Sequence, residues 1–453
     1  MNPSSGSTRS AAAPVCVGTA SAFEEATYRT VTRRLMPLLF GCYILSYIDR
    51  VNVGFAKLQM QQDLQMSDTT YGIAAGMFCI GYLLFEVPAN MLLQRIGARR
   101  WLSSIMILWG LVSASTMFVR SLGTFYLLRF VLGVVEAGFF PGVILYLTFW
   151  YTRRHRAKMI AVFMTAIPLA GVVSGAVSGW ILSTMANFGS LRGWQLLFLC
   201  EGLPSAAAGL VTMRLLKNGP EEASWLSRKQ KDLIAKNLCA EEELKTNGER
   251  RPHRFQDAFR SPAVWLLSLV FFGFAMANYG ISYWMPQMIS DTVTRDPLMI
   301  GLLSMIPWGV GAISMVLMGR HSDATGERRW HIAIAATVGG VTFAVSAIPG
   351  LPGGLSLAAL TLATAGVLAA TATFWSLPSD FLSGTAAAAG IAIINSVGNL
   401  SGYLSPFMAG RIRDATHSMA FALLMFSGSC VVAALIVAML KLRGKQPLEG
   451  SEA

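Results

Sequence analysis

The stretches NMLLQRIGARRW at positions 90–101 and GRHSDATGERRW at positions 319–330 decide the fold of this chain. Both carry a glycine, one spacer residue, a pair of arginines and a tryptophan, in the same order and spacing. The shared residues are Gly97, Arg99, Arg100 and Trp101 in the first stretch and Gly326, Arg328, Arg329 and Trp330 in the second. Both stretches lie between long apolar runs. Such a repeat predicts two halves of the same topology, with the two loops at matching positions.

The apolar runs around these loops are long enough to cross a membrane. Of the 453 residues, 54% are hydrophobic and 13% are charged, about half the charged fraction of a soluble domain. A helix needs about 20 apolar residues to cross a hydrocarbon core of about 30 Å. Soluble helices keep a polar stripe, so these runs exclude an ordinary soluble fold. The predicted fold class is an all-α polytopic membrane protein with twelve transmembrane helices in two six-helix halves.

The predicted spans divide the chain into five parts. The parts are a tail at 1–34, a six-helix half at 35–216, a charged linker at 217–261, a second six-helix half at 262–442 and a tail at 443–453. The twelve spans are expected at 35–57, 71–93, 101–119, 122–149, 157–183, 194–215, 262–288, 299–318, 332–349, 355–379, 385–410 and 418–442. The first tail begins with small and polar residues and lacks the apolar core of a signal peptide, so we expect it to be disordered.

Lys and Arg residues gather in loops on one side of the predicted spans. Cytoplasmic loops are the ones that carry an excess of basic residues. The formal net charge of +12 therefore indicates cytoplasmic N- and C-termini rather than binding of nucleic acid. Arg411 and Arg413, near the end of the eleventh span, are exceptions to this distribution.

Neither cysteine nor histidine forms a metal-binding pattern. The six cysteines have no paired spacing, and the five histidines fall in loops or at span ends. No segment resembles a nucleophile–base arrangement, and the soluble segments are too short for a catalytic domain. We therefore expect no metal, no cofactor and no enzymatic activity.

Four charged residues lie inside predicted spans: Asp49 and Arg50 in the first and Arg129 and Glu136 in the fourth. Each such charge costs about 2.5–3.5 kcal/mol at the centre of a spanning helix, so it must face another charge, water or a ligand. Arg129 and Glu136 share one helical face, about 10 Å apart along the axis. Asp49 and Arg50 are adjacent, so their side chains diverge by about 100°.

These residue types predict transport of an anion together with protons. Arg50 and Arg129 would bind a carboxylate, because a guanidinium group holds a carboxylate in a bidentate fork. Asp49 and Glu136 would bind and release the coupled protons, since burial favours a neutral carboxyl and a nearby arginine favours the charged form. A structural ion-pair network that joins spans one and four is the alternative for the same four residues.

Polar and aromatic residues in other spans complete the predicted binding site. Asn395 and Asn399 lie one turn apart and offer amide donors on one helical face. Tyr47 and Tyr82 interrupt apolar runs, and Trp375 could stack on a planar substrate. Packing and hydrogen bonding between helices are the alternatives for these five residues.

The two basic loops resemble the Gly-x-x-x-Asp-x-x-Gly-x-Arg-Arg signature of the major facilitator superfamily. The second loop carries the full signature, as Gly319, Asp323, Gly326, Arg328 and Arg329. The first loop keeps Gly97, Arg99 and Arg100, with Asn90 and Gln94 where the family has Gly and Asp. The resemblance implies that both loops are gating and structural elements.

Further motifs resemble the anion:cation symporter branch of that family. They are YIDRVNVG at 47–54, GYLLFEVP at 81–88, RFVLGVVEAGFFPG at 129–142, FWSLP at 374–378 and NSVGNL at 395–400. The branch includes bacterial carriers for tartrate, phthalate, hydroxyphenylacetate and sugar acids. The resemblance implies proton-coupled uptake of a small mono- or dicarboxylate by alternating access, with the roles given above for Asp49, Arg50, Arg129 and Glu136.

The expected partners are a small organic anion and the lipid bilayer of a bacterial inner membrane, with a single chain forming the whole pathway. Two other functions fit the same scaffold. One is an anion exchanger or facilitator, and the other is a nutrient receptor that binds without transporting.

Overall fold

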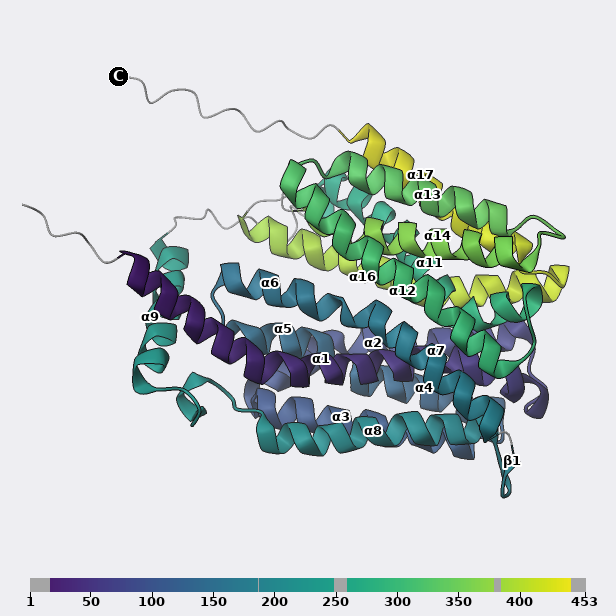
Figure 1. The fold of residues 1–453 in the computed structure, drawn as a ribbon, viewed down its shortest axis with the longest axis horizontal. Coiled ribbons are helices and arrows are strands. Elements are labelled where there is room, and N and C mark those ends of the chain that lie inside the picture. Colours follow the sequence, from purple (N-terminus) through teal and green to yellow (C-terminus); the bar gives the residue numbers. More distant parts are fainter. Residues whose placement is uncertain (1–16, 186, 248–258, 379–383, 441–453) are drawn as a thin grey trace, which may run out of the picture.

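The chain folds into two groups of long helices that lie side by side, with helices of the first half below those of the second half in Figure 1. This computed structural model describes residues 17–185, 187–247, 259–378 and 384–440. The expected tail at 443–453 and part of the linker lie outside the described residues.

The first half contains six spans. They are α1 (Val17–Asp63), α2 (Asp68–Ile96), α3 (Ala98–Ser115) continued by η1 (Thr116–Phe118), α4 (Leu122–Glu136) with α5 (Phe139–Thr148), α6 (Arg153–Met164) with α7 (Ala166–Thr184), and α8 (Gly193–Leu215). A short antiparallel hairpin of β1 (Asn187–Phe188) and β2 (Leu191–Arg192) precedes α8.

The second half also contains six spans. They are α11 (Pro262–Thr292), α12 (Pro297–Thr325), α13 (Arg329–Ser346), α14 (Gly353–Phe374), α16 (Gly384–Thr416) and α17 (Ala420–Met439). The linker between the halves holds η2 (Pro220–Glu222) and α9 (Arg228–Asn247). We call the side of the bundle that carries α9 the linker face and the side that carries the β1–β2 hairpin the hairpin face (Figure 1).

Nine helical segments of the described chain are long and apolar enough to cross a membrane. Three other long helices complete the two halves, and polar side chains reduce the apolar character of each. Asp49 and Arg50 lie in α1, Arg329 begins α13, and α16 contains Asn395 and Asn399. The predicted fold class, an all-α polytopic membrane protein, is confirmed.

Two of the spans are broken by prolines. Pro141 lacks the N–H that would bond the carbonyl of Ala137, and its ring disfavours a continuous helix there. As a result α4 ends at Glu136, and α5 begins at Phe139 after a break of two residues. Pro168 has the same effect in span five, where the chain departs from the helix at Thr165. The first of these breaks directly follows a charged residue of the predicted site.

Small residues let the two halves approach closely near the hairpin face. A Cβ atom on Gly175 of α7 would lie 2.7 Å from the carbonyl oxygen of Gly301 of α12, so neither position accepts a larger side chain. Gly72 of α2 lies still closer to its neighbour, since a Cβ atom there would overlap the carbonyl oxygen of Pro406 in α16. These α7–α12 and α2–α16 contacts hold the halves together on that side.

The first helix begins at Val17 rather than at Leu35, so the expected disorder of the 1–34 tail is wrong for residues 17–34. Tyr28 explains the extension, because its ring is buried and stacks on His155 with 4.0 Å between ring centroids. Asn237 of α9 donates a hydrogen bond to Glu24. Contacts with α6 and α9 therefore accompany the ordered helix in this segment.

Candidate functional site

An ion pair between spans one and four lies at the centre of the candidate site. Arg50 of α1 contacts Glu136 of α4 at 2.6 Å, and Glu136 is only 1% exposed. Ser46, one turn before Arg50, donates a second hydrogen bond of 2.6 Å to the same carboxylate oxygen, Oε1. The other oxygen, Oε2, has no hydrogen-bond partner among the described residues. Glu136 is thus held by one charge and one hydroxyl at the end of a broken helix.

Three aromatic rings surround the guanidinium group of Arg50. Its central carbon lies 4.9 Å from the ring centre of Phe78, 5.4 Å from that of Tyr82 and 5.6 Å from that of Tyr47. Such rings attract a cation through their electron-rich faces, and they also exclude water from it. The guanidinium group of Arg50 is therefore packed against three aromatic faces as well as paired with Glu136.

Arg129 is buried in α4, and no acidic side chain of the described residues pairs with it. Its side chain is 1% exposed, and none of its three guanidinium nitrogens has a hydrogen-bond partner among the described residues. The guanidinium carbon lies 5.3 Å from the ring centre of Phe78. The two arginines therefore lie against one ring, and the donors of Arg129 are buried without a hydrogen-bond partner among the described residues.

Helix α11 of the second half contributes polar groups to the same region. The hydroxyl of Tyr47 lies 3.1 Å from that of Ser282, and Asn278 lies one turn earlier on α11, near the same tyrosine. Tyr279 is close enough to Arg50 to interact with its charge. The candidate site therefore lies between the two halves of the chain.

Asp49 points away from this site. Its two carboxylate oxygens accept hydrogen bonds of 2.6 Å from Ser113 of α3 and from Ser205 of α8. Its side chain is fully buried, and its hydrogen-bond partners among the described residues are hydroxyl groups rather than the arginines. The predicted divergence of Asp49 and Arg50 therefore separates the two residues into different environments. The ion pair of spans one and four includes Arg50 and Glu136 alone.

Three predicted binding residues lie in the second half, apart from the contacts described above. Trp375 packs edge-on against Phe271 and Phe374, with ring centroids 4.7 and 5.6 Å away. Asn395 and Asn399 of α16 are partly exposed. The structure brings Tyr47, Tyr82, Arg50, Arg129 and Glu136 together, and it does not join Trp375 or the two asparagines to them. Their role in binding stays a prediction.

The repeated loops connect spans on the linker face. Gly97 and Gly326 both have positive φ angles, +86° and +69°, which favour glycine. In the first loop Arg99 donates to the carbonyl of Met213 at 2.6 Å, which ties the loop to α8. In the second loop Arg328 donates to the carbonyl of Ser376 and Arg329 to that of Ala438. The remaining predicted loop residues, Arg100, Gly319 and Asp323, lie at or near the surface of the same two connections.

A network of charges closes the hairpin face. Lys57 of α1 contacts Asp68 of α2 at 2.8 Å, and Arg413 of α16 contacts Asp68 at 2.7 Å and Asp291 of α11 at 3.0 Å. Lys57 also donates to Gln287 of α11 at 2.6 Å. These contacts cross between the halves, which explains why a basic residue lies at that end of the eleventh span.

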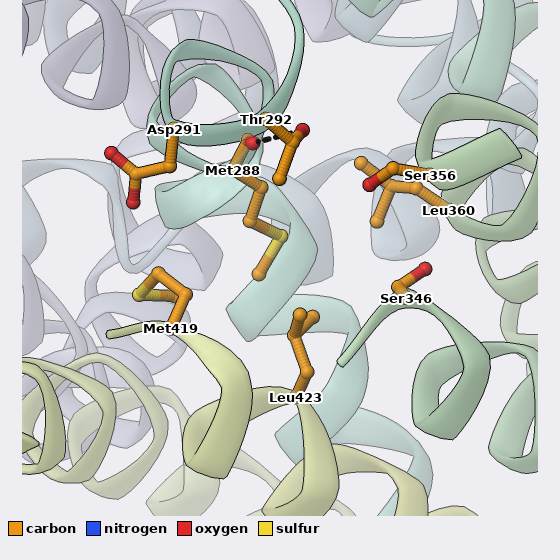
Figure 2. Close-up of a pocket in the computed structure, with 8 residues that line it drawn as sticks. All are labelled: Met288, Asp291, Thr292, Ser346, Ser356, Leu360, Met419 and Leu423. Carbon is orange, nitrogen blue, oxygen red and sulfur yellow. Dashed lines mark hydrogen bonds between the residues drawn. The ribbon is translucent and has the colours of Figure 1, made fainter. Parts of the chain in front are cut away.

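A small cavity lies beside this network, between the ends of α11, α14 and α17 (Figure 2). Met288, Met419 and Leu423 supply most of its apolar surface. Asp291 lies at its edge and is paired with Arg413. The cavity holds no free charge of its own in the described residues, so it does not compete with the arginine site as an anion-binding site.

Sequence reasoning missed Phe78, Lys57, Asn52 and Glu201. Lys57 and Glu201 are charged residues within or at the end of apolar runs, and this signal could have found them. Glu201 is 4% exposed in α8, and Asn52 is fully buried in α1. Phe78 has no such signal, because an aromatic residue in an apolar run is usually packing material.

The comparisons with known proteins agree with this architecture. The sequence profile of the Major Facilitator Superfamily matches residues 39–406. NicT of Pseudomonas putida, a candidate metabolite transport protein, is 42% identical over 413 residues, which cover 91% of this chain and 94% of NicT. A candidate tartrate transporter of Agrobacterium vitis is 42% identical over 422 residues, which cover 93% of this chain and 96% of the relative. The crystal structure of a D-xylose-proton symporter superposes with a TM-score of 0.72 at 15% identity, over 92% of this chain and 99% of that one. The chain therefore belongs to the Major Facilitator Superfamily and is a multi-pass membrane transporter, not an enzyme.

Proposed function

We propose that this transporter carries a small organic anion, a mono- or dicarboxylate, into the cell together with protons. The observation that carries the proposal is Arg129, a buried guanidinium group whose nitrogens have no partner among the described residues. An uncompensated buried charge costs several kcal/mol, so Arg129 requires an anion during part of the transport cycle. A carboxylate matches the planar fork of the guanidinium group.

The pair of Arg50 and Glu136 supplies a means of coupling. Glu136 is held by Arg50 at 2.6 Å and competes with a substrate carboxylate for that guanidinium group. An arriving anion displaces Glu136, which then lies in a low-dielectric region without its counter-charge and binds a proton. When the anion leaves on the other side, Glu136 releases the proton and returns to Arg50. One proton then crosses the membrane with each anion through this exchange.

The aromatic rings support a compact organic acid as the substrate. Phe78, Tyr47 and Tyr82 lie within 4.9 to 5.6 Å of the Arg50 guanidinium carbon and give the site both apolar faces and hydroxyl groups. Such a lining suits a carbon skeleton that carries one or two carboxylates. One relative is named for transport of tartrate, which is a dicarboxylate of this kind.

We infer that the linker face is cytoplasmic and that the membrane is the inner membrane of a bacterium. The arginine-rich loops at Arg99 and Arg328 lie on that face, as the excess of basic residues in cytoplasmic loops leads us to expect. The closed hairpin face then faces outward, and the described conformation is closed toward the outside. A single chain carries both halves of the site, so a monomer suffices for transport.

The test is internal acidification of liposomes that contain the purified protein and a trapped pH dye. L-tartrate, phthalate, 4-hydroxyphenylacetate and galactonate are added outside, one at a time. We expect acidification with at least one of the four acids, and none with Arg129→Gln. Arg120→Gln, an arginine at the surface before α4, is the matched control and should behave as the wild type.

Protein-free liposomes correct for passive leak of the acids. An acid that binds or exchanges without moving protons would contradict symport and favour an exchanger or facilitator. Binding without any movement of the acid would favour a receptor.

A further inference from the structure

A second buried polar cluster lies in the first half, on the side of α1 away from Arg50. It contains two carboxyl groups, Asp49 of α1 and Glu201 of α8. Asp49 and Asn52 are three residues apart on α1, and Glu201 and Ser205 are four apart on α8, so each pair shares a helical face. Ser205 donates to Asp49 at 2.6 Å, which joins the two helices within the cluster.

The contacts of Glu201 are incomplete. Its Oε1 accepts a hydrogen bond of 2.7 Å from Ser178 of α7, whereas Oε2 has no partner among the described residues. The amide group of Asn52 lies next to the Glu201 carboxyl. Asn52 is fully buried, and neither its oxygen nor its nitrogen has a hydrogen-bond partner in the described chain. Two neighbouring buried side chains therefore each keep at least one polar atom without a partner among the described residues.

Within the described residues, no basic side chain is among the groups that face the two carboxyls of the cluster. The groups that face the two carboxyls are hydroxyls, an amide, an indole and further acids, namely Ser113 and Trp109 of α3, Glu136 of α4, Ser178 of α7, Ser205 of α8 and Asn52 of α1. Asp49 and Glu201 repel each other when both are ionised. Two buried like charges cannot both persist without a cation, so at least one carboxyl is protonated for part of the cycle.

We propose that Glu201 is a second proton-carrying residue of this transporter, paired with Asp49 and separate from the arginine site. The proposal rests on the proposed proton-coupled function. In the protonated form, the Oε2 hydroxyl of Glu201 donates to the amide oxygen of Asn52, which satisfies both groups. In the ionised form, the Glu201 carboxylate keeps the hydrogen bond from Ser178 and accepts one from the Asn52 amide nitrogen.

The position of the cluster on α1 connects it to the arginine site. Asp49 and Asn52 face α3, α7 and α8, while Arg50 between them faces Glu136. A shift of α1 that accompanied a change in the partner of Arg50 would also change the distance of Asn52 and Asp49 from α8, because all three residues lie on that helix. Anion binding on one side of α1 therefore biases proton binding on the other side. A carboxyl that served structure alone would keep its proton throughout the cycle.

The first experiment measures the number of protons carried per anion, with L-tartrate as the probe and the membrane potential clamped. We expect Glu201→Gln, which mimics the protonated acid, to lower the proton-to-tartrate ratio by one while tartrate exchange persists. Glu86→Gln removes a half-buried carboxyl of the same half outside the cluster and should leave the ratio unchanged. An unchanged ratio in Glu201→Gln would overturn the proposal, whereas a wild type that moves tartrate without protons would instead overturn the proposed function.

A second measurement does not require a transported substrate. Infrared difference spectra of the full chain in lipid, recorded against pH, report the C=O band of protonated carboxyl groups. We expect Glu201→Gln to remove one titrating band, which belongs to Glu201. A second titrating band, identified as that of Asp49 by its loss in Asp49→Asn, should shift in Glu201→Gln. Ser178→Ala keeps the carboxyl but removes a donor to its ionised form, so the midpoint of the Glu201 band should rise by about one pH unit. No titrating band, or a midpoint that Ser178→Ala leaves in place, would show that Glu201 has a fixed protonation state and would refute the proposal.

Discussion

At the scale of single residues, Arg129 carries the assignment of an anionic substrate. Glutamine keeps part of the shape but removes the charge, so Arg129→Gln should weaken binding of the transported acid more than about 100-fold, or roughly 3 kcal/mol. Arg129→Lys keeps the charge and loses the bidentate fork, so we expect an intermediate loss of about tenfold. Calorimetric titration of the detergent-purified protein measures both changes. Equal losses for glutamine and lysine would contradict a bidentate contact.

Substitution of Glu136 should affect anion binding and proton coupling differently. Glu136→Gln removes the carboxylate that competes with substrate for Arg50, so anion binding should be retained or strengthened. Proton-driven accumulation should be lost, because an amide cannot bind and release a proton in this range. Two measurements in liposomes separate binding from coupling. Exchange of labelled for unlabelled acid across the membrane reports binding and transport, and accumulation of the acid against its gradient reports coupling to protons. Loss of both activities in a folded variant would instead support a structural role for the Arg50–Glu136 pair.

At the scale of helices, the contacts of Arg413 hold α16 against α2 and α11 at the hairpin face. Arg413→Gln removes two ion pairs that are partly exposed to solvent, worth about 1–2 kcal/mol together. The closed hairpin face should open more often, by about tenfold. Cys79, buried in α2 near the α2–α16 contact, reports this opening through its reactivity with a membrane-impermeant thiol reagent when it is the only cysteine.

Arg411→Gln is the matched control for this experiment, because Arg411 is exposed two residues before Arg413 on the same helix. We expect Cys79 in this variant to react as slowly as in the parent protein. Equal reactivity in the two variants would show that the Arg413 pairs do not close the hairpin face.

At the scale of the whole molecule, the orientation in the membrane follows from the basic loops of the linker face. Cys239 of α9 is exposed and unpaired. As the only cysteine, it should react with an impermeant reagent in inverted vesicles and not in intact cells. Ser190→Cys, in the exposed turn of the β1–β2 hairpin, should show the opposite pattern. Labelling of Cys239 in intact cells would reverse the orientation and the assignment of the closed face.

The sequence allowed prediction of features that depend on composition and spacing along one helix. The spans, the repeated loops at Gly97 and Gly326 and the shared face of Arg129 and Glu136 belong to this class. Contacts between residues on different helices could not be predicted. No local sequence pattern shows that Asp49 accepts hydrogen bonds from Ser113 and Ser205 rather than pairing with an arginine. The helical start at Val17 was missed for the same reason, because its order comes from contacts of Tyr28 with α6. Glu201 was visible as a charge in an apolar run, but its relation to Asn52 required the fold.

The most direct test of the central claim is accumulation of labelled L-tartrate in liposomes under a pH gradient of one unit, acidic outside, with the membrane potential held at zero. Each net proton per anion multiplies accumulation about tenfold, since each tenfold ratio corresponds to 1.4 kcal/mol. The exchange at Glu136 alone predicts accumulation to about ten times the external concentration, and Glu136 together with Glu201 predicts about 100 times. Without the gradient, tartrate should only equilibrate, and Arg129→Gln should take up none in either condition. Equilibration without accumulation in the presence of the gradient would contradict the account, because the protein would then carry the anion without coupling it to protons.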